Sequence, residues 1–312
     1  MDKIVLATDL GGTNLRLAAI SDKGEILYRT KYATPKTERA DEIVCAIMNA
    51  ARECREAVGE KGEIKAIGLA VPATINAAAG IIMKAPNLPA LDGFRLSATL
   101  TEELNLPVVL ENDANAAAIG ENWMGASKGF QNSICVMLGT GVGGGIVLDG
   151  NILRGVDGTA GEIGHICVEP LGAPCGCGSR GCVEQYSSAT AISRLTLELE
   201  SHYPKSELQN KLRVTALDVY EAGKLGDELA LEVFRQVGFY LGIALADLVN
   251  VLNPEVIVIG GGVSAGWDLL IHHVQAQIRN RSFREPAERA KLIRAKLGDD
   301  AGILGVAKLA LN

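Results

Sequence analysis

Residues 138–184 read LGTGVGGGIVLDGNILRGVDGTAGEIGHICVEPLGAPCGCGSRGCVE, and this stretch decides how the rest of the chain is interpreted. It opens with a glycine turn between two apolar runs, which is typical of two strands joined by a tight connection. Glu162 and His165 follow in the segment GEIGH. Three cysteines then occur within eight residues: Cys175, Cys177 and Cys182.

The three cysteines and His165 form a ligand set typical of structural zinc, which is commonly bound tetrahedrally by three thiolates and one imidazole. The spacing Cys-x-Cys-x4-Cys is tighter than in zinc fingers, and interleaved glycines would let the loop wrap closely around an ion. The alternatives are a redox pair or scattered core cysteines. A cytosolic redox pair would rather have two residues between its cysteines. We therefore predict a structural zinc site with no open position for chemistry.

Outward from this stretch, one pattern of strands and helices occurs twice, which indicates an α/β protein with a duplicated domain. The first copy has strands over residues 4–8, 15–20, 25–32 and 65–71 and a helix over 39–58. The second has strands over 133–138, 145–148, 151–154 and 255–259 and helices over 189–201 and 227–252. Two unrelated glycine hairpins are the alternative, but the order of the elements matches as well as the turns.

Four ordered motifs make the chain similar to a known family. They are DLGGTN at 9–14, ENDANAAA at 111–118, GTGVGGGIVLDGNILRGVDGTAGEIGH from 139, and CGCGSRGC from 175. Together they resemble the ROK family of sugar kinases and repressors over essentially the whole chain, and within it the bacterial glucokinases. The resemblance implies two actin-like (ribonuclease-H-like) domains around a central cleft. We expect residues 1–115 plus 299–312 in a smaller domain, with the last helix packed on it, and 116–298 in a larger domain with the zinc loop.

Two glycine turns are candidates for binding the phosphates of ATP through backbone N–H groups, although most such turns are only turns. Their residues are Gly11, Gly12, Thr13 and Asn14 in the first turn, and Gly139, Thr140 and Gly141 in the second. Asp9 could hold Mg²⁺ through water. Gly261 and Gly262, between a strand and a helix, are placed for the nucleotide base or ribose, or form a plain tight turn.

The motif ENDANAAA places Asp113 between a buried strand and a helix, so Asp113 could simply cap that helix. The resemblance instead implies that Asp113 is the catalytic base that accepts the proton of the sugar 6-hydroxyl. It also implies that Asn87 and Asn112 bind sugar hydroxyls, and that Glu162, His165 and Glu184 bind the other side of the ring. Ala73 departs from the glycine common in such glucokinases, and Arg16 is either part of a glucokinase motif or a surface residue.

Composition limits the class of protein. The 312 residues suit two domains, and a net charge of −7 disfavours a nucleic-acid partner. With three of seven cysteines assigned to zinc, we expect Cys45, Cys54, Cys135 and Cys167 to be reduced core thiols, as in a reducing cytosol. We see no signal peptide and no uncharged apolar run of membrane-spanning length. The resemblance implies a cytoplasmic homodimer or homotetramer.

The leading interpretation is an ATP-dependent glucose kinase that requires Mg²⁺ and a structural Zn²⁺. Rivals within the enzyme class are N-acetylmannosamine kinase and fructokinase. A repressor of the same family would carry an N-terminal helix-turn-helix domain, for which the few residues before Asp9 leave no room. An actin- or Hsp70-like ATPase would lack the zinc cluster and the sugar-side carboxylates.

Overall fold

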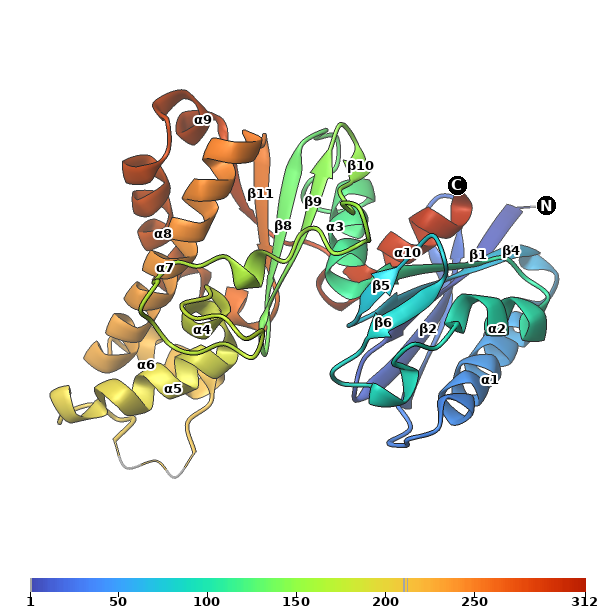
Figure 1. Cartoon of the computed structure of the whole chain (residues 1–312), viewed down its shortest axis with the longest axis horizontal. Helices are drawn as coiled ribbons and strands as arrows, with labels where there is room; N and C mark the ends of the chain where they lie inside the picture. The colour runs from blue at the N-terminus through green and yellow to red at the C-terminus, as the bar shows by residue number, and fades with distance from the viewer. Residues whose placement is uncertain (1, 210, 212) are drawn as a thin grey trace. The chain divides into compact units, whose positions relative to one another are not determined.

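The computed structural model describes residues 2–209, 211 and 213–312, and it has a mixed α/β fold that divides into two compact units (Figure 1). The first unit comprises Met1–Gly129, Gly145–Gly161 and Leu297–Asn312, and the second comprises Phe130–Gly144 and Glu162–Lys296. The first unit thus extends beyond the expected limit at residue 115. The physical reason is that helix α3 (Asp113–Trp123) packs against α10 (Ala301–Leu311), which belongs to the same unit.

The sheet of the first unit has the strand order β3-β2-β1-β4-β7. Its strands are β1 (Asp2–Leu10), β2 (Asn14–Ser21), β3 (Ile26–Ala33), β4 (Gly62–Val71) and β7 (Val108–Asn112). The first three strands are antiparallel, whereas β4 runs parallel to β1 and β7 runs parallel to β4. Side chains of β1 alternate between two buried clusters, since neighbouring residues of a strand point to opposite faces.

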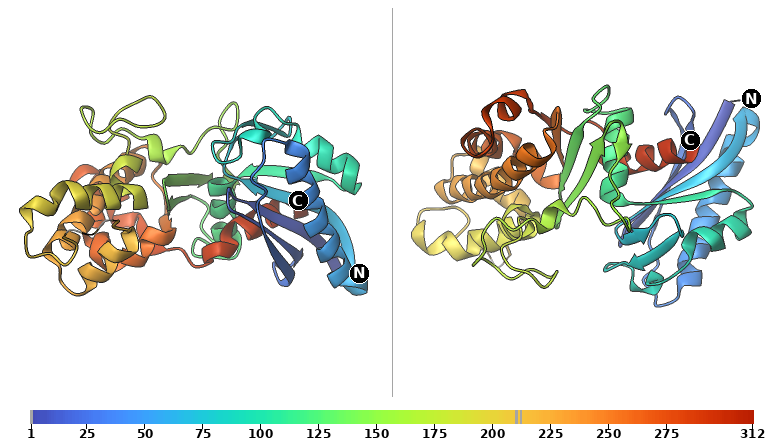
Figure 2. Two further views of the ribbon diagram at one scale, coloured as in Figure 1. Left: turned by 90° about the horizontal axis from the view of Figure 1, so that it is seen from below. Right: turned by 45° about the horizontal axis from the view of Figure 1, so that its top comes forward.

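Helices cover both faces of this sheet, as Figure 2 shows from two sides. One core includes residues of α1 (Ala40–Val58) and α2 (Leu96–Leu104), and the other includes residues of α10. Helix α10 can approach α3 closely because residue 305 is a glycine. A Cβ at this position would overlap the carbonyl group of Ala116. The predicted return of the last helix to the first part of the chain is therefore confirmed. The first unit also contains a hairpin of β5 (Thr74–Asn76) and β6 (Ile81–Lys84).

The second sheet repeats the strand order of the first, as β10-β9-β8-β11-β12. Its strands are β8 (Ser133–Leu138), β9 (Val142–Leu148), β10 (Asn151–Ile152), β11 (Val256–Gly260) and β12 (Lys291–Arg294). Strand β11 runs parallel to β8 and β12, and β10 is antiparallel to β9. In each sheet the first three strands lie in the reverse of their order in the chain, and the two strands that come later in the chain follow on the other side of the first strand. This shared order confirms the predicted duplication of the strand pattern.

The helices of the second unit pack around a long central helix, α7 (Glu228–Leu252). The others are α4 (Glu184–Ser187), α5 (Ala189–Leu199), α6 (Ala216–Lys224), α8 (Trp267–Arg281) and α9 (Arg284–Arg289). By length and composition α7 alone, among the described residues, could cross a membrane, but 61% of that stretch is buried inside the protein. Gly238 and Gly242 bring α7 close to the backbone of α8, as expected for a core helix.

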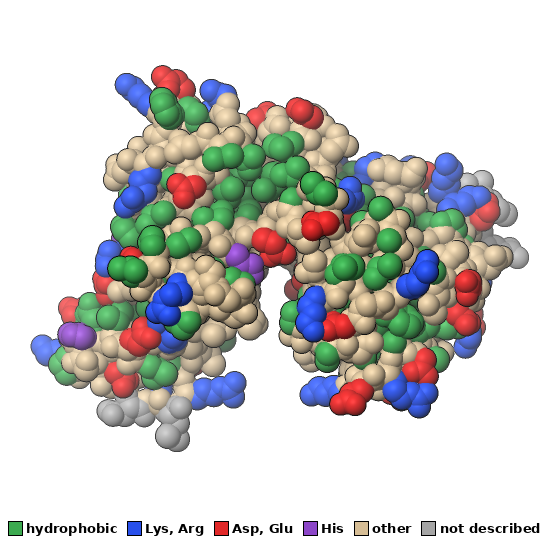
Figure 3. All heavy atoms as spheres, viewed as in Figure 1, with side chains coloured by type: hydrophobic (Ala, Val, Ile, Leu, Met, Phe, Trp, Pro, Cys, Tyr) green, Lys and Arg blue, Asp and Glu red, His purple; other side chains and the backbone are tan. Residues whose placement is uncertain are grey.

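On the face seen in Figure 3, acidic and basic side chains are interspersed over each unit.

The cysteines outside the predicted zinc site differ in burial. Cys54 and Cys135 are buried as expected, whereas Cys45 and Cys167 are exposed, so for these two residues the prediction of core thiols was wrong. An apolar neighbourhood in sequence does not fix burial, since Cys45 lies on an exposed position of α1.

Candidate functional site

The first unit brings several predicted site residues to one edge of its sheet. Asp9 lies near the end of β1, and Asn112 ends β7. These strands and β4 are parallel, so their carboxyl ends meet at the same edge, where α/β sheets commonly bind ligands. Asp113 follows directly, as the first residue of α3.

Asp9 is a partly buried carboxylate, with 26% of its side chain exposed, and its neighbours shift its pKa in opposite directions. Its pKa is raised to about 6, chiefly by burial and also by the negative charges of Asp113 and Asp299, whereas Arg16 lowers it. The guanidinium of Arg16 lies 3.7 Å from an Asp9 carboxylate oxygen and 3.0 Å from Asp299. Arg16 is therefore not a plain surface residue, because it bridges β1 and the segment before α10. A bound cation would stabilise the charged form of Asp9, which fits the predicted magnesium role.

The first glycine turn is closed by backbone hydrogen bonds and lies against Asn87. The Gly11 N–H donates to the carbonyl of Asn14 at 2.9 Å, and the Thr34 hydroxyl donates to the carbonyl of Gly11 at 2.7 Å. A Cβ at Gly12 would lie 2.9 Å from the Cβ of Asn87. The predicted phosphate turn and a predicted sugar ligand thus lie side by side. Glycine at position 12 permits that approach.

Helix α3 is capped by Asn112 and not by Asp113. The Asn112 side-chain oxygen accepts hydrogen bonds from the N–H groups of Ala114 and Asn115, at 2.9 and 3.1 Å. Its amide group donates to the backbone carbonyl of Ala73 at 3.2 Å. The cap interpretation of Asp113 was therefore wrong, although its carboxylate also accepts from the Ala114 N–H at 2.9 Å. The sugar-binding role of Asn112 stays a prediction.

Glu111 and Arg154 form an ion pair beside this helix start that sequence reasoning missed. The Arg154 Nε and Nη2 atoms lie 2.8 and 2.7 Å from the same Glu111 oxygen. The Glu111 side chain is only 3% exposed, against 37% for Arg154. The available signal was a charged residue inside the otherwise apolar strand that precedes Asn112. Because the two residues are 43 positions apart, the sequence did not reveal the partner.

In the second unit, the turn of Gly139, Thr140 and Gly141 is fixed by the segment that starts α4 and α5. The Ala189 N–H donates to the Gly139 carbonyl at 2.8 Å, and the Thr190 hydroxyl donates to the Thr140 carbonyl at 2.8 Å. The Val142 N–H donates to a carboxylate oxygen of Glu184 at 3.0 Å. The second predicted phosphate turn is thus joined to the predicted sugar ligand Glu184.

His165 faces two different groups with its two ring nitrogens. Its Nδ1 lies 3.6 Å from the Cys175 sulfur, and its Nε2 lies 3.9 Å from a Glu162 carboxylate oxygen. Glu162 is half-exposed, with 56% of its side chain accessible. The Nδ1 atom thus faces the cysteine cluster, while the Nε2 atom is directed to a second partner, as is usual for a histidine that binds metal.

The four predicted zinc ligands are brought together. One ligand atom from each of His165, Cys175, Cys177 and Cys182 lies within 4.8 Å of the others. The Cys177 and Cys182 sulfurs are 3.6 Å apart, close to the roughly 3.8 Å between two thiolates on one tetrahedral zinc. Burial raises the pKa of Cys182 to about 12, so a cation is needed to hold this sulfur as thiolate. The residues present therefore fit a zinc ion.

The glycines after β11 have different environments. Gly261 has a φ of +81°, and a Cβ there would overlap the backbone of Leu138, so a tight turn accounts for this glycine. A Cβ at Gly262 would meet no atom within 4 Å. The close approach of chain segments therefore explains Gly261 but not Gly262. The nucleotide role of both residues stays a prediction.

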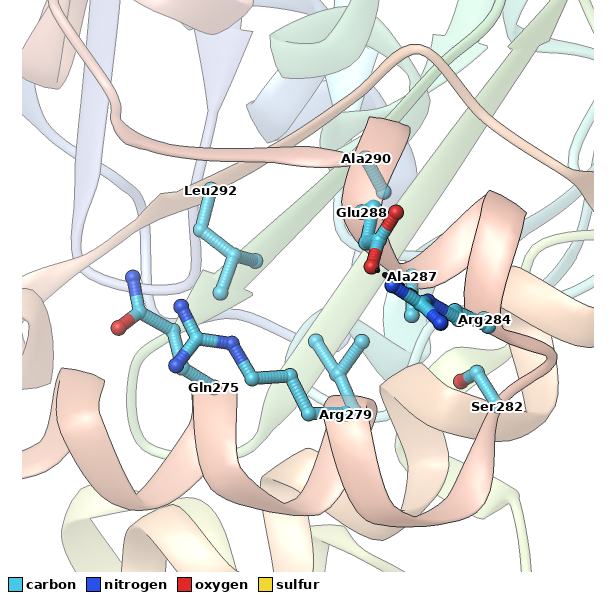
Figure 4. A pocket seen from close by; sticks show the side chains of 9 residues that line it. Gln275, Arg279, Ser282, Arg284, Ala287, Glu288, Ala290 and Leu292 are labelled. Atoms are coloured by element: carbon cyan, nitrogen blue, oxygen red, sulfur yellow. Dashed lines mark hydrogen bonds and ion pairs between the residues drawn. The ribbon is translucent and has the colours of Figure 1, made fainter.

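A separate pocket of about 580 Å³ in the second unit contains none of the predicted site residues. It lies between α8, α9 and β12 (Figure 4). Its polar lining comes from Gln275, Arg279, Ser282, Arg284 and Glu288. Arg284 and Glu288 pair with each other at 2.8 Å, and apolar side chains line the remaining wall. We therefore assign the candidate site to the residues around Asp9 and Asp113 in the first unit and around Glu184 and His165 in the second.

Comparison with known proteins agrees with this geometry. The model of the ROK family matches residues 5–312. A glucokinase from Halalkalibacterium halodurans is 42% identical, covering 97% of this chain and 94% of its own. The crystal structure of a ROK family glucokinase from Streptomyces griseus, in complex with glucose and AMPPNP, is 33% identical with a TM-score of 0.80 and covers 98% of both chains.

One regulator is also similar. A ROK family transcriptional regulator, a homologue of the E. coli MLC protein, superposes with a TM-score of 0.91 at 29% identity, over 99% of this chain and 78% of its own. Kinases and regulators of one family thus share the fold, so the fold alone does not separate them. The match over residues 5–312 shows that this chain belongs to the ROK family.

Proposed function

We propose that this protein transfers the γ-phosphoryl group of ATP to the 6-hydroxyl of glucose. The observation that carries the proposal is the cluster in the first unit. There Asp113 lies close enough to Asp9 to raise its pKa, and the Gly12 turn lies against Asn87. Phosphoryl transfer to an alcohol needs a general base, a carboxylate that binds the metal ion, backbone N–H groups that bind phosphate, and side chains that bind the sugar. The glucokinase relatives support the choice of sugar.

In the proposed mechanism, Asp113 orients the 6-hydroxyl and accepts its proton as the new bond to phosphorus forms. Asn87 and Asn112 bind hydroxyls on the same side, while Glu162, His165 and Glu184 bind those on the other side. Charged acceptors form the stronger hydrogen bonds to hydroxyl groups. Magnesium, held through water by Asp9, would neutralise charge on the transferred phosphoryl group.

The remaining cofactor contacts follow the two glycine turns. Backbone N–H groups of both turns would bind the phosphates, and Gly261 and Gly262 would adjoin the base or ribose. Zinc on His165, Cys175, Cys177 and Cys182 would hold the loop that carries the sugar-side residues, in a purely structural role. The distances among the four ligand atoms support this assignment.

We further propose that the repeated sheets are two actin-like domains around a central cleft, with glucose and ATP bound between them. We propose that these domains correspond to the two compact units, whose limits differ from the expected 1–115 plus 299–312 and 116–298 because α3 packs against α10. The shared strand order of the two sheets supports the duplication. A cytoplasmic homodimer or homotetramer without a nucleic-acid or membrane partner completes the proposal. On the face seen in Figure 3 the interspersed charges are not those of a basic nucleic-acid surface.

The alternatives are other sugars and another class of protein. N-acetylmannosamine or fructose would be accepted through the same carboxylates, and a sugar-responsive regulator would bind the sugar without transferring phosphate. The similarity to a transcriptional regulator is the observation that favours the last alternative. It would not need Asp113 as a base.

A coupled kinase assay over glucose, 2-deoxyglucose, N-acetylmannosamine and fructose tests the proposal. We expect glucose to exceed 2-deoxyglucose in kcat/KM by about tenfold or more, because an unsatisfied buried partner costs roughly 1–3 kcal/mol. N-acetylmannosamine should be poorer still. A higher kcat/KM for N-acetylmannosamine than for glucose would overturn the choice of sugar, and binding without phosphorylation would overturn the kinase proposal.

A further inference from the structure

The Glu111 carboxylate joins two parts of the first unit that are remote in sequence. One oxygen accepts both hydrogen bonds from Arg154, at 2.7 and 2.8 Å. The other accepts from the Asn112 N–H and the Asn115 side-chain amide, each at 3.1 Å. The second pair of donors flanks Asp113 in the chain. The carboxylate therefore contacts the first turn of α3 on one side and the segment that follows β10 on the other.

Arg154 is itself held in place by its surroundings. It follows β10, whose register against β9 pairs Asn151 with Leu148, and the Arg154 carbonyl accepts from the Ala160 N–H at 3.1 Å. The loop between these residues contains Gly158, where a Cβ would overlap the carbonyl oxygen of Ile75. Arg154 is therefore anchored by a strand before it and a closed loop after it. Its guanidinium can serve as a fixed point for Glu111.

A buried ion pair is a costly way to gain stability. Removing two charges from water offsets most of their attraction, and a well-packed apolar pair would often serve as well. Glu111 is 3% exposed, so its carboxylate carries most of this cost, whereas Arg154 is 37% exposed and keeps part of its contact with water. The pair is therefore better explained by the orientation that it imposes. Two nitrogens of one guanidinium that meet at a single carboxylate oxygen restrict where that oxygen can lie, which an apolar contact does not.

We infer that Arg154 is a positioning residue for phosphoryl transfer, which acts through Glu111 on the first turn of α3 and so on Asp113. The inference rests on the proposed function for its catalytic readout. A base must lie within hydrogen-bond reach of the hydroxyl that it deprotonates. A displacement of about 1 Å in such a group costs about 100-fold in rate. Loosening the Glu111 carboxylate would allow such a displacement without removing a group that touches substrate.

The first experiment compares Arg154→Met, Arg154→Lys and Glu111→Gln with wild type, using Arg284→Met as control. The control cuts an exposed arginine–glutamate pair in the second unit. We expect Arg154→Met to lower kcat by about 10- to 100-fold, while the glucose Kd measured by calorimetry changes less than about threefold. Arg154→Lys should lower kcat less than Arg154→Met does, since lysine keeps the positive charge but lacks the planar guanidinium. The control should keep wild-type kcat.

The second experiment separates positioning from general support of the fold. If Arg154 acts through Asp113, Arg154→Met should cause less than about a twofold further loss in kcat in the Asp113→Asn background. Losses that multiply in the double variant would overturn the inference. So would a folded Arg154→Met protein with a kcat within about twofold of wild type. If Arg154→Met does not fold, Arg154→Lys and Glu111→Gln decide by the same comparison.

Hydrogen exchange keeps this test distinct from a test of the kinase proposal. If wild-type protein phosphorylates none of the hexoses, the proposed function fails, but the positioning contact can still be measured. We then expect the amides of Ala114 and Asn115 to exchange about tenfold faster or more in Arg154→Met, because the first turn of α3 opens more often. Unchanged exchange at these two amides would overturn the inference.

Discussion

The carboxylate of Glu184 accepts a hydrogen bond from the backbone N–H of Val142 at 3.0 Å. Val142 directly follows the second glycine turn, whereas Glu184 begins α4, 42 residues later. A residue proposed to bind sugar is thus joined by a hydrogen bond to the turn proposed to bind phosphate. Events at the sugar side and at the phosphate turn should therefore affect each other.

Gly141→Ala tests this connection, since a Cβ at Gly141 would overlap the Glu184 carboxylate. We expect the KM for ATP and the KM for glucose both to rise by about tenfold, because the carboxylate must move from its hydrogen-bonded position. Steady-state kinetics with each substrate varied will measure this. If the clash is the cause, adding Gly141→Ala to Glu184→Ala should have little further effect. Fully multiplicative losses would contradict it.

Asp113→Asn tests the proposed base. The variant keeps the shape of the side chain and its hydrogen bonding to the Ala114 N–H, but removes the proton acceptor. We expect kcat to fall by about 10²–10⁴-fold while glucose binding measured by calorimetry survives. Near-normal turnover in this variant would rule out Asp113 as the base.

Zinc removal tests the metal site. We expect one zinc ion per chain in protein purified without chelator, and we expect Cys177→Ala to lose it because three ligands hold the ion less tightly. Glucose affinity should weaken more than ATP affinity, since His165 is both a ligand and a neighbour of Glu162. Elemental analysis and calorimetry measure these quantities. Cys45→Ala, at an exposed thiol, is the matched control and should keep its metal.

Asp9→Asn should stabilise the protein while it lowers activity. Burial raises the folded-state pKa of Asp9 to about 6 from an ordinary value of 3.8, so the native state binds this proton more tightly than the unfolded state does. Its charge therefore costs up to about 3 kcal/mol above pH 6, and the cost disappears as the pH falls from 6 to 4. Urea unfolding without magnesium should show a gain for Asp9→Asn at pH 7 that vanishes near pH 4. Asp22→Asn, at an exposed carboxyl, is the control, and an equal gain there would contradict this account.

Gly305→Ala tests the packing of α10 on α3. A Cβ at Gly305 would overlap the Ala116 carbonyl, so the helices must separate, which costs about 1–3 kcal/mol in unfolding free energy. Gly302→Ala is the matched control on the same helix, because its Cβ would lie 3.9 Å from that of Ala70. The control should be neutral or stabilising by about 0.5–1 kcal/mol. Urea unfolding curves measure both, and equal effects would refute the packing explanation.

The sequence predicted most of what local patterns can encode. The strand at Ser133–Leu138 is found with the expected bounds, and the duplicated strand order and the clustering of His165 with three cysteines were both expected. These features depend on periodicity, on glycine turns and on ligand types close together in the chain. Such signals act over a few residues and need no knowledge of the fold.

The errors arose where the answer depends on distant neighbours. Whether Asn112 or Asp113 caps α3 is decided by which side chain reaches the free N–H groups, and both types suit that position. The partner of Glu111 lies 43 residues away and became visible only with the fold. The exposure of Cys45 is set by the direction in which α1 turns that side chain.

The chain passes between its two compact units four times, after Gly129, Gly144, Gly161 and Lys296. Because α10 supplies part of one core of the first unit, that core is incomplete until α10 has been synthesised. The amino-terminal sheet must therefore wait, with one apolar face uncovered, while the whole second unit is synthesised. During synthesis this uncovered face is open to chaperones and proteases until α10 packs on it.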